Sequence, residues 1–204
     1  MKKLFLSTAA IVAMSAPAMA NDYVDRTFTG PYMGVYGGYG WQDGDIDGAG
    51  DVELDGGDYG IYAGFKADTL LDNTINQLGL GLTGAVEIYY GWSDSDQTIG
   101  ALSLEKNHEY GISFRPGLSI IDDLSPVDVN PYGILGYKRA EFEATIPGAS
   151  GDETYDGFEL GIGTEVVAYD NVGVRIEYAH TWYGEEDGID IDEDTVRLGL
   201  GYNF

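Results

Sequence analysis

Apolar residues alternate with small or polar residues along most of the chain after residue 30. Between Leu80 and Trp92, for example, the even-numbered positions are apolar apart from Gly84, and the odd-numbered positions are mostly small or polar. A period of two residues indicates a β-strand, because successive side chains of a strand point to opposite faces of the sheet. No segment shows a helical period. We predict strands over residues 32–41, 59–66, 80–92, 108–118, 132–143, 158–166, 172–182 and 196–204.

The segment 132–143 has an ambiguous pattern, because either choice of faces places a charged side chain among the apolar ones. We assign Tyr132, Ile134 and Phe142 to the apolar, outward face. This choice favours a β-bulge, or an early end of the strand, near Gly136.

Long and short connections alternate between these strands. The connections 42–58, 93–107, 144–156 and 184–193 are long, polar and rich in glycine or aspartate, whereas 121–128 and 169–171 are shorter and 69–78 is intermediate. An even number of antiparallel strands with this alternation is typical of outer-membrane barrels. The predicted fold is an all-β, eight-stranded antiparallel up-and-down transmembrane β-barrel over residues 30–204.

The first twenty residues have the features of an export signal. A basic start at Lys2 and Lys3 precedes an apolar run of Leu4 to Met14, and small residues follow at Ala18 and Ala20. The apolar run is too short to span a membrane. We predict a signal peptide over residues 1–20, cleaved after Ala20, and a short periplasmic segment over residues 21–29.

The face between the apolar positions consists mostly of glycine, alanine, serine and threonine, with single charges of both signs. A soluble barrel or sandwich would also alternate, but it would bury its bulky apolar residues and expose charges. Small residues suit the narrow lumen of an eight-stranded barrel, so we assign the apolar face to lipid.

Charges in such a lumen must be paired. We predict that Glu165 pairs with Arg175 near Glu177, and that Glu87 lies diagonal to Arg115. The predicted lumen charges are Glu87, Arg115, Arg139, Glu159, Glu165, Arg175, Glu177 and Arg197, with Lys66 on the same face.

Tryptophan occurs at the C-terminal ends of the first, third and seventh predicted strands. In an up-and-down barrel these ends share one rim, which is the rim from which the long connections emerge. Aromatic residues are enriched at the interfaces of such barrels with water. We predict an outer aromatic girdle of Trp41, Trp92, Trp182, Tyr59 and Tyr110.

The chain ends inside its last predicted strand, with apolar residues at alternate positions up to a terminal phenylalanine. This end resembles the C-terminal strand by which assembly machinery recognises outer-membrane proteins. The matching residues are Val196, Leu198, Leu200, Tyr202 and Phe204.

The segment from Thr29 to Trp41 is similar to the first strand of small barrels of the OmpA-like and opacity-protein type. The resemblance implies an eight-stranded outer-membrane barrel with periplasmic termini and surface-exposed loops. No peptidoglycan-binding domain follows Phe204, so the resemblance does not support tethering to the cell wall.

The charge of the chain excludes several classes of function. The 204 residues carry 35 acidic and 10 basic side chains, a formal charge of −25, and no cysteine. A nucleic-acid partner is therefore excluded, and so are thiolate metal sites. The acidic stretch 43–55 resembles the start of a calcium loop, but Leu54 stands where a bidentate glutamate is expected. We predict no cofactor and no specific metal site, only weak attraction of divalent cations to four acidic loops.

These features favour a non-enzymatic barrel with a structural or surface-interaction role, whose partners are outer-membrane lipid or lipopolysaccharide and the assembly machinery. A lipid-modifying or proteolytic barrel is one alternative, and it would need a histidine beside a serine or paired carboxylates. His108 and His180 both fall on the lipid-facing phase near the outer rim, where an imidazole can sit among headgroups. A narrow diffusion channel is the other alternative. The ligand of the loops and the oligomeric state are not specified by the sequence.

Overall fold

The computed structural model describes residues 28–46, 50–70, 80–99, 102–120, 127–146, 149–168, 171–184 and 189–204. The predicted signal peptide and most of the predicted periplasmic segment lie outside the described residues. Within the described residues, no helix is long and apolar enough to cross a membrane.

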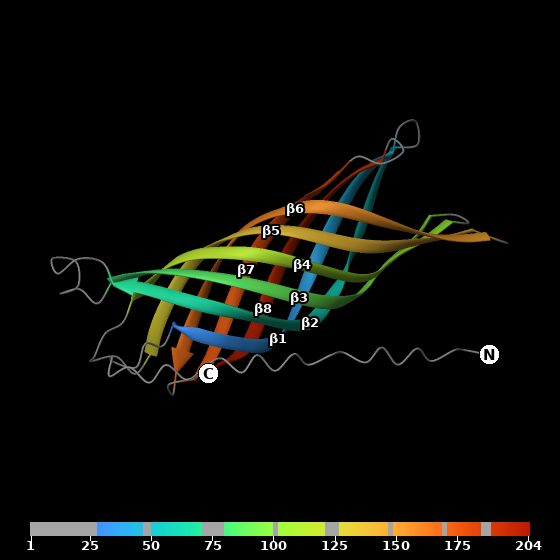
Figure 1. Ribbon diagram of the computed structural model, residues 1–204. Coiled ribbons are helices and arrows are strands. Elements are labelled where there is room, and N and C mark those ends of the chain that lie inside the picture. The colour runs from blue at the N-terminus through green and yellow to red at the C-terminus, as the bar shows by residue number, and fades with distance from the viewer. Residues whose placement is uncertain are drawn as a thin grey trace.

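Eight antiparallel strands close into a barrel in which each strand pairs with its neighbours in the sequence, and β1 pairs with β8 (Figure 1). The number, order and direction of the strands confirm the predicted fold. The strands are β1 (Gly30–Ile46), β2 (Gly50–Leu70), β3 (Leu80–Ile99), β4 (Leu102–Ile120), β5 (Val127–Ile146), β6 (Ala149–Ala168), β7 (Val172–Tyr183) and β8 (Ile189–Asn203).

The strands extend well beyond their predicted outer ends, so the prediction of long outer loops was wrong. β1 and β2 remain paired up to Ile46 and Gly50, and β5 and β6 remain paired up to Ile146 and Ala149. Most of the residues assigned to loops therefore belong to hairpins that continue past the aromatic girdle. Their composition suggested loops, but antiparallel neighbours supply the backbone hydrogen bonds that hold them as strands.

The apolar face points outward in seven of the eight strands, as predicted. Typical side chains of this face, such as Val35, Ile88 and Leu198, are 54%, 59% and 60% exposed. The five predicted girdle residues are also exposed, and Tyr59 stacks on Trp92 across the β2–β3 pair.

The predicted orientation of β5 was wrong. Tyr132 and Ile134 are buried in the lumen, and Phe142 packs against buried residues there, whereas Leu135 and Tyr137 face outward. Both faces of this strand carry apolar residues, so the pattern could not distinguish them. The predicted bulge near Gly136 is also absent, because β5 and β6 pair continuously across that residue.

Irregularities occur instead on the neighbouring strands. The register shifts between Trp92 and Ser95 on β3, and again between Lys106 and His108 on β4. Further along, the pairing of β4 with β5 is interrupted at Pro116 and at Pro131, which have no partner on the other strand of this pair. Proline has no backbone N–H, so it cannot complete a ladder at these positions.

The last residue closes the barrel next to the first strand. Tyr32 pairs with Asn203, and the Phe204 N–H donates a 3.0 Å hydrogen bond to the Pro31 carbonyl. The Phe204 side chain is 60% exposed on the outward face beside Tyr202. Both edges of the sheet are thus removed, as a strand-built membrane protein requires.

Candidate functional site: a charged lumen

Tyrosine side chains fill much of the lumen and lie over glycines of facing strands. Tyr32, Tyr36, Tyr62 and Tyr89 form one buried cluster. A methyl group on Gly64 would collide with the Tyr32 ring, and one on Gly91 would collide with the Tyr36 hydroxyl. Glycine on the inward face therefore provides the room that an eight-stranded barrel otherwise lacks.

The half of the lumen nearest the start of β1 and the end of β8 holds a balanced group of charges, which we call the inner network. It contains three cations and three carboxylates: Lys66, Arg115, Arg175, Glu87, Glu165 and Glu177. Both guanidinium groups contact the same two carboxylates, Glu87 and Glu177.

The arginines of the inner network have several partners each. Arg175 donates two hydrogen bonds to Glu87, at 2.6 and 3.1 Å, and its guanidinium lies 3.5 Å from the centre of the Tyr62 ring. Arg115 lies 2.7 Å from Glu87 and also pairs with Glu177. Bidentate and stacked contacts of this kind are specific to arginine.

A second group of charges, the outer network, lies toward the opposite end, at the level of the aromatic girdle. It contains four carboxylates and three cations: Asp58, Glu109, Glu159, Glu193, Lys106, Lys138 and Arg197. Lys106 and Lys138 each bridge Glu109 and Glu193 at distances of 2.5 to 2.8 Å. Arg197 joins Glu109 to Glu159 at 3.0 and 3.3 Å.

Aromatic residues close the lumen beyond the outer network. Ala140, Tyr155 and Tyr183 are buried together, and Phe142 packs on both tyrosines with edge-on rings. The Tyr183 hydroxyl donates a 2.6 Å hydrogen bond to Glu193, which links this aromatic layer to the outer network.

Seven of the eight predicted lumen charges lie in the lumen, and Arg139 does not. Its guanidinium pairs with Asp156 on the outward side, where both side chains are about two-fifths exposed. This correction follows from the reversed orientation of β5, which turns Lys138 inward instead. Among the predicted pairs, Glu87 contacts Arg115, but Glu165 pairs with Lys66 although it faces Arg175 in the β6–β7 register.

Sequence reasoning missed most of the outer network. Lys106, Asp58 and Glu193 fell within predicted loops, and the predicted phase of residues 132–143 placed Lys138 on the outward face. One available signal was that Lys106 is the single basic residue within the acidic connections. A lone cation in such surroundings could have been recognised as the partner of buried carboxylates.

The two histidines lie on the outward face at the girdle. His180 makes a 2.9 Å contact with Asp194 and packs edge-on against Trp182. His108 stacks on Tyr90 and lies 3.6 Å from Glu141. In the described chain neither imidazole is hydrogen-bonded to a serine or threonine hydroxyl.

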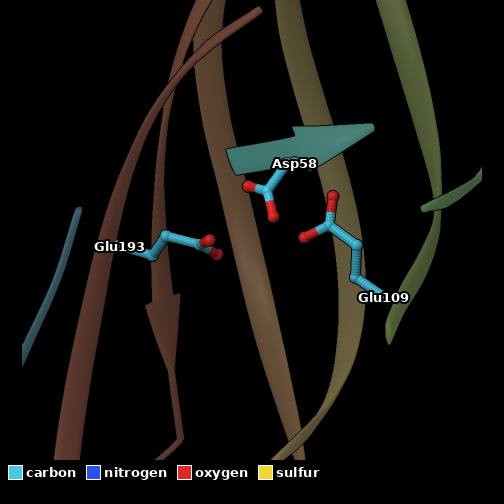
Figure 2. Close-up of side chains that lie close together, drawn as sticks. All are labelled: Asp58, Glu109 and Glu193. Atoms are coloured by element: carbon cyan, nitrogen blue, oxygen red, sulfur yellow. The ribbon is translucent and has the colours of Figure 1, made fainter. Parts of the chain in front are cut away.

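Three buried carboxylates converge in the outer network in a way that resembles a metal site. Figure 2 shows Asp58, Glu109 and Glu193 pointing toward one another, with one oxygen of each within 4.8 Å of the others. The ammonium group of Lys106 already lies 2.5 Å from Glu193 and 2.8 Å from Glu109. A divalent ion bound to all three carboxylates would have to displace it.

The acidic stretch 43–55 does not form a calcium loop. Asp43 pairs with Glu53 and Asp45 pairs with Asp51, so most of the stretch consists of two paired strands. A calcium loop of the type suggested by the sequence wraps its ligands around the ion in one irregular turn. The described part of this hairpin therefore lacks the required backbone path.

Comparison with known proteins places this barrel in a family. A model of the outer membrane protein beta-barrel domain matches residues 6–204. The chain belongs to this family. Its location in an outer membrane follows from that membership.

The relatives are outer-membrane proteins too. The 25 kDa outer-membrane immunogenic protein of Brucella ovis is 26% identical, with the match covering 100% of this chain and 98% of that protein. The 22 kDa outer membrane protein of Rhizobium leguminosarum bv. viciae is 27% identical over 83% of this chain and 64% of its own length. The crystal structure of Neisserial surface protein A has the same fold, with a TM-score of 0.51, 16% identity, and 84% of this chain and 97% of that chain covered.

Proposed function

We propose that this member of the family is a closed, non-conducting barrel that acts through its extracellular surface. The observation that carries the proposal is the filled lumen: every charged residue of the two networks is at most 8% exposed. Ion pairs join facing walls at two levels, and the aromatic layer lies above them. Between the described side chains of these groups, we infer that a hydrated solute has no continuous path.

The free space beside the inner network is small. A cavity lined by Tyr32, Arg115 and Tyr132, among others, has a volume of about 20 Å³. This volume accommodates about one water molecule. It supports an anchor more than a diffusion channel.

The same arrangement leaves the outer surface acidic. The lumen contains Lys66, Lys106, Arg115, Lys138, Arg175 and Arg197, so few basic side chains remain for the surface. Beyond the girdle, the described hairpins expose carboxylates, namely Asp43, Asp55, Asp94, Glu105, Asp152 and Glu153. A surface of one sign attracts divalent cations, and it attracts cationic partners more strongly than anionic ones.

We further propose that the barrel is not an enzyme and that its precursor is exported by a signal peptide cleaved after Ala20. The carboxylate and aromatic partners of His108 and His180 support an interfacial role for both side chains. The name of the Brucella relatives, which refers to immunogenicity, supports display at the cell surface.

Conductance separates this proposal from a channel. Purified barrel reconstituted in planar lipid bilayers is expected to give no stepwise currents in potassium chloride, with a general porin as the positive control. Reproducible single-channel steps would favour the diffusion channel.

An assay of lipid A tests the enzyme alternative. If the barrel is not a lipid-modifying enzyme, mass spectrometry should find unchanged lipid A in cells that express it.

A further inference from the structure

The two networks differ in their charge balance. The inner network contains as many carboxylates as cations, whereas the outer network has four carboxylates and three cations. One negative charge therefore remains in a region where every network side chain is at most 4% exposed. An unpaired buried charge is strongly unfavourable, so a further positive charge is needed nearby.

The contacts assign this excess charge to Asp58. Glu109 and Glu193 are saturated, because Lys106 and Lys138 bridge them and each accepts further hydrogen bonds. Glu159 shares Arg197 and accepts a bond from the Tyr89 hydroxyl, both through its Oε2 atom, whereas its Oε1 atom has no partner among the described residues. Asp58 is only 3% exposed and lies 3.7 Å from Lys106, and neither of its oxygens has a hydrogen-bond partner among the described residues.

The side chain of Gln42 lies near Asp58 and also carries an oxygen that has no partner among the described residues. Gln42 is 3% exposed and uses its Nε2 atom to donate to Glu193 at 2.8 Å, but its Oε1 atom has no hydrogen-bond partner. A methyl group on Gly40 would lie 3.0 Å from Gln42 Nε2, 3.1 Å from Asp58 Oδ2 and 3.3 Å from Glu193 Oε1. The three side chains thus surround one point, which Gly40 leaves free of a side chain.

We propose that the outer network binds one monovalent metal cation, of the size of sodium or potassium, between Asp58 and the Gln42 amide. The carboxylate of Asp58 supplies the balancing charge. The Gln42 oxygen supplies a second hard ligand once its amide turns over, and the cation then replaces the Nε2 hydrogen bond as the link between Gln42 and Glu193. The inference does not depend on the proposed surface role.

The surroundings select a single positive charge. A monovalent ion brings the outer network to neutrality, whereas a divalent ion would leave one positive charge in excess. The neighbouring Lys106 ammonium would also repel a divalent ion more strongly. The carboxylates of Glu109 and Glu193 are already shared by two lysines, so they cannot complete the oxygen shell that calcium requires.

The test measures stability in matched salts. The full barrel, refolded in detergent, is heated in sodium, potassium or choline chloride at equal ionic strength, and the unfolding midpoint is read from its gel mobility. Choline is too large for the site. We expect a higher midpoint in sodium or potassium chloride than in choline chloride. The barrel should also broaden the sodium-23 resonance, and this broadening should saturate as the sodium concentration rises.

Two variants locate the effect. Asp58→Asn removes the excess charge and should abolish the difference between sodium and choline. Gln42→Leu should raise the half-saturating sodium concentration about tenfold, because the site loses one ligand. This variant keeps the proposal testable if Asp58→Asn fails to fold. Asp43→Asn is the matched control, because it removes a carboxylate one residue away on the exposed, outward face; it should keep the full sodium effect.

Other results would overturn the proposal. Equal midpoints in sodium and choline would show that Asp58 is neutralised by a proton. A larger Asp58-dependent stabilisation by calcium or magnesium would replace the monovalent ion with a divalent one. Loss of the sodium effect in Asp43→Asn would assign it to the acidic surface.

Discussion

The two charged networks lie in the same lumen, but they are built differently. The inner network uses two arginines, whose planar groups grip Glu87 and Glu177 and stack on tyrosine rings. The outer network relies on two lysines, which bridge Glu109 and Glu193 as point charges and leave Asp58 without a hydrogen bond from any described residue. Balanced arginine pairs fix geometry, whereas lysine bridges with an excess carboxylate leave room for another cation. The difference suggests that the inner network is structural and that the outer network can respond to ions.

The largest expected effect tests the structural role of the inner network. Arg175→Met leaves Glu87 and Glu177 with Arg115 alone, and one buried carboxylate charge is then uncompensated. The free energy of unfolding should fall by about 3–5 kcal/mol, measured by urea titration in detergent micelles. The double variant Arg175→Met/Glu87→Gln restores the balance and should recover most of the loss. A double variant as unstable as the single one would contradict the charge-balance argument.

A smaller effect compares equivalent changes in the two networks. Glu177→Gln gives the inner network an excess positive charge, whereas Glu193→Gln brings the outer network to equal numbers of carboxylates and cations. The outer variant should therefore lose about 1–2 kcal/mol less of the free energy of unfolding than the inner variant. The same urea titration, in choline chloride, makes the comparison. Equal losses would indicate that hydrogen bonds, and not net charge, dominate both networks.

The smallest effect concerns an ion pair outside both networks. Arg139 holds the pKa of the Asp156 carboxyl below its usual value through hydrogen bonds, but both side chains are open to solvent. The stabilisation is therefore present at neutral pH and is lost as the pH falls below the ordinary carboxyl range. Because solvent screens the pair, Asp156→Asn should leave the unfolding midpoint unchanged within error at neutral pH. A loss comparable to that of Glu193→Gln would show that exposed and buried pairs contribute alike.

The strands and most of their orientations could be predicted from the sequence because lipid and lumen demand opposite side chains. On β7, for example, Val174 and Ile176 alternate with Arg175 and Glu177, and one face is plainly apolar. β5 could not be oriented in this way. Its lumen face carries Tyr132 and Ile134, and a local pattern does not reveal that other strands supply the charges around them.

Most of the outer network was missed for a different reason. The register shift between Lys106 and His108 changes which positions face inward, so Lys106 and Glu109 both reach the lumen despite their odd spacing. Asp58 and Glu193 lie in acidic segments whose composition suggests loops. Only the pairing of the extended hairpins shows that these side chains remain inside the barrel.

The contact between inward glycines and tyrosine rings has a consequence for how such a sequence can change. The Tyr36 hydroxyl lies over Gly91, and the Tyr132 ring lies over Gly163. A larger residue at one of these glycines is compatible with the fold only if the facing tyrosine becomes smaller. Glycine and tyrosine positions on facing strands should therefore vary together among related chains. The abundance of glycine in this sequence is explained in part by the space that the tyrosine rings of the lumen require.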